Sequence, residues 1–207
     1  MIKLENGEVY GWEPAIRGMR NPMNSWDRSD SGYNEDVDDF VIGINDYDLM
    51  QRLCKGGPVH AKFRRMITVY VDITAPLYWW KEFDTYKVGT VANSCSTMHK
   101  IHAKEFTVAD FSTEHLDQYN STLFNMIIRN LNNARQAFLD TKNKESWWQM
   151  IQLLPSSYNQ KRTVELNYEV LNNIYHSRLG HKLDEWREVC RWIENLPHSW
   201  IITGKEI

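Results

Sequence analysis

The hydrophobic residues of this chain follow two different periods, and this change of period constrains the fold more than any other feature. Over residues 66–73 apolar and polar side chains alternate, which predicts a half-buried strand whose buried face is formed by Ile67, Val69, Val71 and Ile73. Over residues 116–138 apolar side chains instead recur at spacings of three and four, which predicts a long amphipathic helix. A chain that contains both patterns is predicted to fold in the α+β class.

Shorter patterns add further elements to this prediction. Residues 1–12 have the character of an edge strand, and alternation over residues 163–167 predicts another strand. Capping residues, prolines and glycines delimit five more helices, expected from Asn45-Asp46 to Cys54, from Ala75-Pro76 to about Tyr86, over 147–154, over 170–178 and over 183–194. Residues 20–45 are rich in Asp, Ser, Asn and Gly, and they predict an ordered loop or insertion. Residues 1–207 together are predicted to form one helix-rich domain.

Charge and cysteine content limit the functions open to this chain. The net charge is −3 and the pI is about 6.2, so no global electrostatic attraction draws the protein to nucleic acid or to anionic membranes. Any phosphate group would have to be bound by local donors. The three cysteines are widely spaced, which argues against a disulfide framework, and the N-terminus lacks a signal-peptide pattern. These features predict a cytoplasmic protein without a transmembrane segment.

The chain is also rich in aromatic residues, with nine Trp, ten Tyr and seven Phe. Aromatic side chains pack in cores and subunit interfaces, and they also stack on flat rings. In the pairs Trp79-Trp80 and Trp147-Trp148, one side chain can enter the core while the other meets a partner. The aromatic content therefore fits an oligomer, although it does not require one.

Three polar patterns imitate other kinds of site without completing one. Asp27-x-Ser29-x-Ser31-Gly32 imitates a calcium-binding loop but lacks the final Glu of such a loop. His99-x-x-His102 lacks a third metal ligand, and Cys95 has no identifiable general base nearby other than His99. The sequence therefore predicts neither a metal site nor a nucleophilic cysteine.

Two segments about sixty residues apart have the clearest functional meaning. The first begins at Ala75-Pro76 and continues through Thr85-Tyr86-Lys87-Val88-Gly89-Thr90 to Asn93-Ser94-Cys95-Ser96-Thr97. Small and hydroxylated residues on an irregular backbone offer N–H and O–H donors to a phosphate or a flavin ring. The second segment contains Leu153-Leu154-Pro155, then Asn167, Arg178 and Glu185. In their order and separations, these residues resemble the motifs of the flavin-dependent thymidylate synthases.

The resemblance covers about residues 56–100 and 145–193, and it implies a fold, an assembly and a chemistry. It implies a central antiparallel sheet, a homotetramer, and FAD bound across a subunit interface. It implies that a pyrimidine nucleotide, such as dUMP or a modified analogue, stacks on the flavin. In an active enzyme, a one-carbon unit would pass from methylenetetrahydrofolate to the uracil base, and NADPH would reduce the flavin.

The same resemblance assigns roles to eight positions of this sequence. Contacts to the cofactor are implied for His60, Lys87, Thr90 and Asn167. Contacts to the substrate are implied for Glu82, Ser96, Thr97 and Arg178. Arg178 is also the implied catalytic residue, because a guanidinium stays cationic and offers forked donors that polarise a carbonyl of the pyrimidine base.

Several positions depart from the family's motifs. Only Lys87 keeps a positive charge where the family has Arg-His-Arg, Glu82 replaces a Gln, and three further arginines are replaced by Met98, Ile151 and Glu169. The loss of two phosphate-binding arginines would weaken binding by roughly 100- to 10,000-fold. Charge from other directions would have to come from Lys100, Lys104, Lys161 or Arg162. The sequence therefore leaves two functions open, a diverged FAD-dependent enzyme with an altered substrate and a non-catalytic protein that binds or sequesters a nucleotide.

Overall fold

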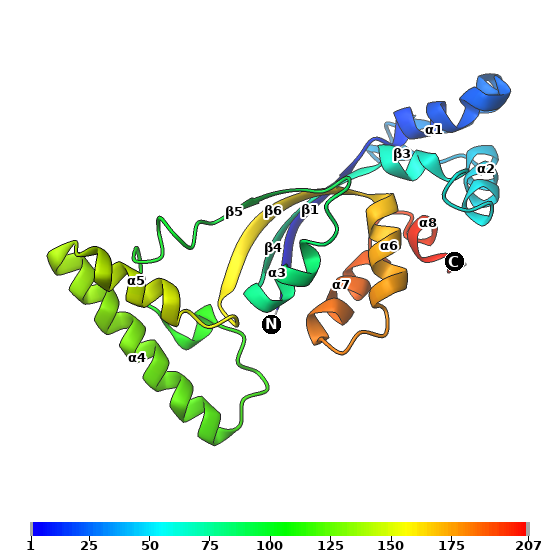
Figure 1. The fold of residues 1–207 in the computed structure, drawn as a ribbon. Helices are drawn as coiled ribbons and strands as arrows, with labels where there is room; N and C mark the ends of the chain where they lie inside the picture. The colour runs from blue at the N-terminus through cyan, green and yellow to red at the C-terminus, as the bar shows by residue number, and fades with distance from the viewer. Residues whose placement is uncertain (1, 206–207) are drawn as a thin grey trace. The chain divides into compact units, whose positions relative to one another are not determined.

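The computed structural model describes residues 2–205, and the chain forms two compact units (Figure 1). Unit 1 comprises residues 2–3, Asp72–Thr85 and Ala92–Thr163, and unit 2 comprises Leu4–Val71, Tyr86–Val91 and residues 164–205. Several strands contain residues of both units, among them β4 (Thr68–Pro76) and β6 (Asn159–Asn167). The single domain expected over residues 1–207 therefore remains a prediction.

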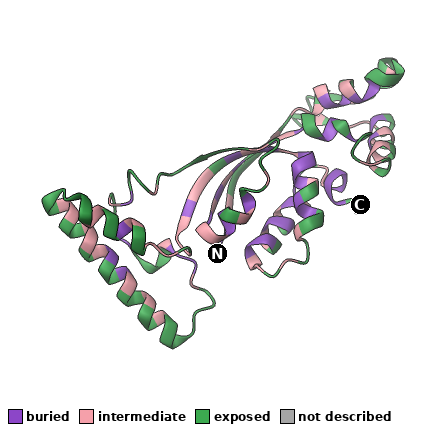
Figure 2. Cartoon of the chain, in the orientation of Figure 1, coloured by how far each residue is buried: buried purple, intermediate pink, exposed green. Residues whose placement is uncertain are grey.

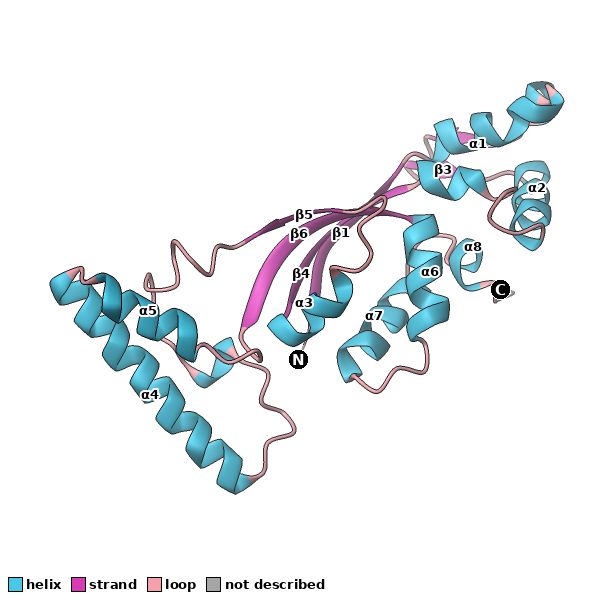
Figure 3. Cartoon of the chain, in the orientation of Figure 1, coloured by secondary structure: helices cyan, strands magenta, loops and turns pink. Residues whose placement is uncertain are grey.

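The main sheet confirms the α+β prediction with a central antiparallel sheet (Figure 3). Its strand order is β1-β4-β6-β5, with β1 (Lys3–Tyr10) and β5 (Val91–Ser94) at the two edges. The predicted edge strand near the N-terminus is thus confirmed. The predicted buried face is also confirmed, because Ile67, directly before β4, and Val69, Val71 and Ile73 within it are at most 2% exposed.

Unit 2 is rich in helices. Its helices are α1 (Trp12–Arg20), α2 (Ile44–Lys55), α6 (Tyr168–Arg178), α7 (Asp184–Glu194) and α8 (Trp200–Thr203), with 3-10 turns η1 (Asn21–Met23), η2 (Trp26–Arg28) and η3 (Lys62–Met66). Among them, α6 packs against η3, α7 and α8. Most of the buried side chains of α6 and α7 are apolar or aromatic, and Figure 2 shows buried positions of both helices in purple. The predicted helices over 170–178 and 183–194 are confirmed, whereas α8 is too short to produce a detectable period.

Unit 1 contains a helical hairpin and its own core. Its helices are α3 (Leu77–Phe83), α4 (Gln118–Thr141) and α5 (Lys144–Leu153), with the 3-10 turn η4 (Val108–Asp110). The core consists of aliphatic and aromatic side chains from these helices and the preceding loop: Ile101, Phe106, Phe111, Ile128, Leu131 and Met150. The long amphipathic helix and the helix near 147–154 are confirmed.

The start of α3 differs from the prediction. Ala75 and Pro76 still belong to β4, and the helix begins at Leu77 and ends at Phe83 rather than near Tyr86. The reason is a pairing with a distant segment, since Leu77 N donates to Tyr158 O and Tyr78 N donates to Ser156 O, both at 3.0 Å. These bonds extend the strand and satisfy the first amide groups of the helix.

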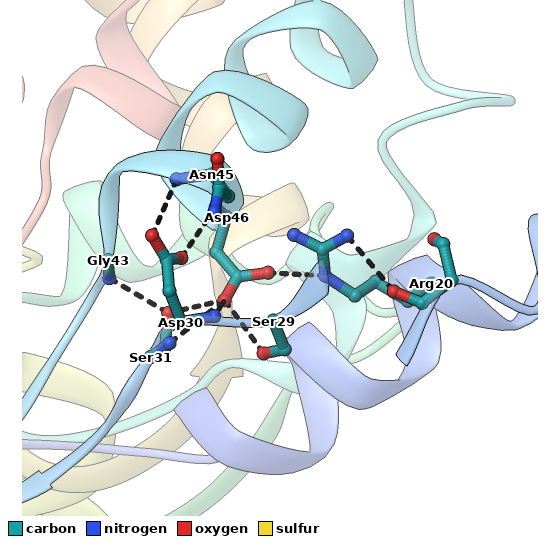
Figure 4. A network of polar contacts seen from close by, with 8 residues as sticks. Arg20, Ser29, Asp30, Ser31, Gly43, Asn45 and Asp46 are labelled. Carbon is teal, nitrogen blue, oxygen red and sulfur yellow. Dashed lines mark hydrogen bonds and ion pairs between the residues drawn. The ribbon is translucent and has the colours of Figure 1, made fainter. Parts of the chain in front are cut away.

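Residues 20–45 are more regular than the predicted loop. They contain η1, η2 and a hairpin of β2 (Gly32–Asn34) and β3 (Asp39–Val41), in which Gly32 pairs with Val41. The helix that follows, α2, is not capped by its own Asn45 or Asp46 side chain. Instead, the carboxylate of Asp30 accepts hydrogen bonds from Asn45 N at 2.9 Å and from Asp46 N at 3.2 Å (Figure 4). The predicted local cap is therefore wrong, and a cap from the loop replaces it.

The side chain of Asp46 has a different role, as the centre of a buried polar network (Figure 4). Its carboxylate accepts from Arg20 Nε at 2.6 Å, from the hydroxyls of Ser29 and Ser31 at 2.8 and 2.7 Å, and from two backbone amides. The serines of the calcium-like pattern thus bind a carboxylate of the chain itself. Among residues 2–205, no three His, Cys, Asp or Glu side chains gather as a metal ion would require. Within the same residues, no helix combines the length and hydropathy of a membrane span.

Candidate functional site

A hollow in unit 2 brings together two of the predicted cofactor residues. Its volume is about 220 Å³, and it lies where the start of β4, the 89–91 segment and the end of β6 meet. It is lined by Arg65, Thr68, Gly89, Thr90, Val91, Glu165, Leu166 and Asn167. Thr90 and Asn167 are 77 positions apart in the sequence, and the fold places both on one wall.

Asn167 is fixed in this hollow by its position at the junction of β6 and α6. It is the N-cap of α6, and its Oδ1 accepts from Glu169 N and Val170 N, both at 3.1 Å. Gly89 lies against the other end of the amide, because an added Cβ at Gly89 would stand 2.9 Å from Asn167 Nδ2. Gly89 also has φ +74°, a backbone conformation that favours glycine. The amide of Asn167 is therefore held in one orientation by its cap and its neighbour.

Thr90 contributes an unsatisfied hydroxyl. Its Oγ1 is buried and, among residues 2–205, has no hydrogen-bond partner. A buried hydroxyl without a partner carries a desolvation cost, and such groups in folded proteins usually find a partner. A ligand that supplied a donor or acceptor here would remove that cost, so the residues of this hollow fit a polar ligand group.

Positive charge reaches the hollow from a residue that the sequence analysis did not select. Arg65, an exposed residue of η3, lines the hollow together with Glu165 of β6. The sequence feature that could have pointed to Arg65 is the pair Arg64-Arg65 shortly before β4. Only the pairing of β4 with β6 shows which of the two arginines lines this hollow. Arg65 is thus a local cation for a phosphate or a carbonyl oxygen.

Three of the cations considered as substitutes for the missing arginines are bound to carboxylates. Lys161 Nζ lies 2.9 Å from Asp72 Oδ2, and Arg162 Nη1 lies 2.7 Å from Asp84 Oδ1. Lys104 forms an ion pair with Asp110, and its hydrogen bond to that carboxylate raises the pKa of Lys104. Burial alone would raise the pKa of Asp110, but the hydrogen bond from Lys104 and those from Thr107 outweigh it, so the pKa of Asp110 is lowered. The guanidinium of Arg162 also stacks on the Trp80 ring at 4.0 Å. These cations stabilise unit 1, and an added phosphate would have to compete with their carboxylates.

Arg178, the predicted catalytic residue, is held between aromatic rings at the end of α6. Its Nε donates to Tyr86 Oη at 3.0 Å, and its guanidinium lies 4.7 Å from the centre of the Trp186 ring. Cation–π contacts of this kind favour a charged guanidinium with a fixed orientation. Tyr86, which stands in the altered Arg-His-Arg segment, thus supports Arg178.

The other predicted residues lie elsewhere. His60 and Lys87 are exposed residues of unit 2, and the ring of His60 packs near Gly56. Glu82, Ser96 and Thr97 belong to unit 1. Ser96 closes its own turn, because its Oγ accepts from Met98 N at 3.2 Å and from His99 N at 2.9 Å. Two amides of the predicted phosphate turn are therefore already satisfied by Ser96.

Comparison with solved structures shows which fold this arrangement belongs to. No protein-family model and no curated protein sequence matches the chain. The flavin-dependent thymidylate synthase ThyX from Helicobacter pylori, complexed with FAD and dUMP, aligns over 98% of both chains with a TM-score of 0.69 and 16% identity. The chain has the fold of the flavin-dependent thymidylate synthases.

Two further structures agree with this thymidylate synthase fold. A second H. pylori ThyX structure with FAD and dUMP aligns with a TM-score of 0.67 and 16% identity, over 98% of this chain and 97% of that one. The UMP/dUMP methylase PolB from Streptomyces cacaoi, bound with 5-Br dUMP, aligns with a TM-score of 0.63 and 13% identity, over 99% and 95%. The resemblance noted in the sequence motifs is therefore confirmed at the level of the fold.

Proposed function

We propose that this protein binds FAD and a pyrimidine nucleotide, and that it transfers a one-carbon unit to the uracil base. The observation that supports this proposal best is the hollow in unit 2, where Thr90 and Asn167 meet beside Arg65. The resemblance to the flavin-dependent thymidylate synthases implied that both residues contact the cofactor, and both line this hollow. Solved structures with the same fold hold FAD and dUMP.

Each residue of the hollow would have a simple role toward the ligand. Thr90 would gain the hydrogen-bond partner that its buried hydroxyl lacks among residues 2–205, and Asn167 would present its amide while it caps α6. Arg65 would contact a phosphate or a carbonyl oxygen. When bound, a reduced flavin supplies the redox chemistry of the transfer. His60 and Lys87 are proposed as further cofactor contacts.

Arg178 would act on the substrate. Its guanidinium, oriented by Tyr86 and Trp186, would donate to a carbonyl oxygen of the uracil ring and stabilise negative charge that develops there. Glu82, Ser96 and Thr97 are proposed as contacts to the rest of the nucleotide. With Met98, Ile151 and Glu169 in place of arginines, a modified pyrimidine nucleotide suits this chain better than ordinary dUMP.

A hollow of about 220 Å³ is smaller than the usual pocket for a drug-sized ligand, so it would hold only part of FAD. We propose that a homotetramer completes the site. Exposed apolar side chains follow one face of α4 at spacings of four and three, which suits a subunit interface: Tyr119, Leu123 and Met126. Methylenetetrahydrofolate as the carbon donor and NADPH as the reductant belong to the same proposal, as does the cytoplasm as location.

A second function is favoured by the ion pairs of unit 1. Because Lys104, Lys161 and Arg162 are bound to carboxylates, three of the four cations considered as substitutes for the missing arginines are already engaged. A protein with this arrangement would bind or sequester a nucleotide without turning it over. The two functions differ in product formation, whereas both require ligand binding at the same hollow.

The test is a titration of the purified full chain with FAD, followed by fluorescence, together with mass spectrometry of small molecules released on denaturation. Thr90→Val should weaken FAD binding by roughly 2- to 10-fold, the equivalent of one neutral hydrogen bond, without loss of stability. Thr122→Val, an exposed position of α4, is the matched control and should bind FAD as the wild type does. Arg178→Ala should leave FAD bound and abolish binding of the nucleotide.

The outcomes separate the two functions. Release of FAD and formation of a methylated pyrimidine nucleotide from the complete reaction mixture would establish the enzyme. Nucleotide binding without product, at full FAD occupancy, would establish the binding protein. Absence of FAD binding at excess flavin would overturn the flavin site, and equal affinities of wild type and Thr90→Val would overturn the placement of that site.

A further inference from the structure

A second cavity in unit 2 shares no lining residue with the proposed flavin hollow. Its volume is about 340 Å³, within the range of small-molecule pockets, and it is enclosed by α2, η3, α6 and α8 with the turn that follows α8. Its apolar wall includes Pro58, Trp200 and Ile202, and its polar wall includes Lys55, Arg64 and Asn172. All of these residues belong to unit 2.

The polar groups of this cavity that need a partner are donors. Arg64 is 6% exposed and Trp200 is 6% exposed, and within residues 2–205 neither Arg64 Nε nor Trp200 Nε1 has a hydrogen-bond partner. Guanidinium and indole N–H groups can only donate. A complementary ligand must therefore offer acceptors, and a carboxylate offers the strongest ones.

The charges of the residues that line the cavity also favour an anionic ligand. Lys55, Arg64 and Lys205 line it, and none of the described lining residues is acidic. Arg64 is only partly compensated, because its Nη1 lies 3.6 Å from Glu169 Oε2 and donates to Asn172 Oδ1 at 3.1 Å. Lys205 is paired with Glu194 at 2.6 Å, so Arg64 and the exposed Lys55 supply the attraction for an anion.

We propose that this cavity is a binding site for a small organic anion, a carboxylate with an apolar or aromatic body. The carboxylate is received by Arg64 and by the indole N–H of Trp200, after a small adjustment of these buried groups. The apolar body packs against Pro58, Trp200 and Ile202. This site lies apart from the Thr90–Asn167 hollow, and it does not depend on the flavin proposal.

The test uses a matched pair of probes, phenylacetate and its neutral amide, phenylacetamide, with the full chain and isothermal titration calorimetry. Phenylacetate should bind at least about tenfold more tightly, because only the carboxylate forms charge-assisted hydrogen bonds with Arg64. Arg64→Met should remove that preference. Arg52→Met, at an exposed arginine of α2 that does not line the cavity, is the control and should keep it.

A second variant covers the case in which Arg64→Met fails to fold. Trp200→Phe removes the indole N–H, which has no partner among residues 2–205, and retains most of the ring. It should weaken phenylacetate binding by roughly 2- to 10-fold and phenylacetamide binding by a smaller factor, because a carboxylate accepts a stronger hydrogen bond than an amide oxygen.

Cys54 reports whether the probe occupies this cavity. The thiol lines the cavity and is half-buried, whereas Cys95 is exposed and serves as the internal control. Burial raises the pKa of the Cys54 thiol, so alkylation by iodoacetamide is followed at mildly alkaline pH. Phenylacetate should slow alkylation at Cys54 and leave the rate at Cys95 unchanged. Equal affinities for the two probes, no binding of either at millimolar concentration, or an unprotected Cys54 would each overturn the proposal.

Discussion

In unit 2, the buried arginine–carboxylate pairs Arg20–Asp46 and Arg64–Glu169 differ in how completely their polar atoms are hydrogen-bonded. Arg20 and Asp46 are 2.6 Å apart, with side chains 4% and 0% exposed, and Asp46 accepts four further hydrogen bonds from the 29–31 segment. Arg64 and Glu169 are 3.6 Å apart, and within residues 2–205 neither Arg64 Nε nor Glu169 Oε2 has a hydrogen-bond partner. Around the Asp46 carboxylate the first pair is closed, although Arg20 Nη2 also lacks a hydrogen-bond partner among residues 2–205, whereas the second pair is open at both Arg64 Nε and Glu169 Oε2.

This difference assigns the two pairs to different tasks. A buried ion pair offsets its desolvation only when geometry and added hydrogen bonds are good, as they are at Asp46. That network joins α1 to the start of α2, so it stabilises the fold. The Arg64–Glu169 contact is longer, and Arg64 lines a cavity. This arrangement suits an arginine that binds a ligand. The stability of variants at the two pairs tests whether one is structural and the other serves ligand binding.

The largest effect is expected at the closed pair. Asp46→Asn leaves the Arg20 guanidinium buried without its counter-charge, and it should lower the free energy of unfolding by about 3–5 kcal/mol. Urea denaturation followed by circular dichroism measures the change. Asp48→Asn, at an exposed position two residues further along α2, is the control. Its free energy of unfolding should stay within about 0.5 kcal/mol of that of the wild type. A loss at Asp46 no larger than at Asp48 would mean that the network does not hold the fold.

A smaller effect is expected at the open pair. Glu169→Gln keeps the shape of the side chain and removes a charge whose contact to Arg64 is already long, so the loss should be about 1–3 kcal/mol, below that of Asp46→Asn. Glu188→Gln, at a partly exposed residue of α7 that pairs only with Arg191 among the described contacts, is the control. A loss equal to that of Asp46→Asn would assign the Arg64–Glu169 pair to the same structural task, and it would weaken the case for a ligand at Arg64.

The sequence predicted the parts of this structure that depend on local period. The β4 strand, the long helix α4 and the helices α5, α6 and α7 were all expected from apolar spacing. The errors arose where distant segments decide the outcome. Pro76 stays in a strand because the 156–158 segment pairs with the start of α3, and Asp30, not Asp46, caps α2.

The candidate sites show the same limit. The family resemblance selected Thr90 and Asn167, which the fold brings to one hollow. It did not select Arg65, because only the β4–β6 pairing shows that Arg65 faces that hollow while its neighbour Arg64 lines another cavity. Two adjacent arginines with identical chemistry thus serve different surfaces, and no local pattern distinguishes them.

The smallest effect is the pH dependence of the closed pair. Burial alone would raise the pKa of Asp46, but hydrogen bonds from Ser31, Ser29 and Arg20 outweigh it and hold the pKa below the ordinary value of 3.8. Asp46 therefore contributes stability that is present above pH 3.8 and lost as the pH falls toward its lower folded-state pKa, because the unfolded chain takes up the proton first. The difference in free energy of unfolding between wild type and Asp46→Asn should decrease by about 0.3 kcal/mol from pH 7 to pH 4. Below pH 4 it should decrease more steeply with pH. Urea titrations across this range measure it. If the difference in free energy of unfolding instead increased toward acid pH, burial would outweigh the hydrogen bonds at Asp46. The Asp46 network would then be as incompletely satisfied as the Arg64–Glu169 pair.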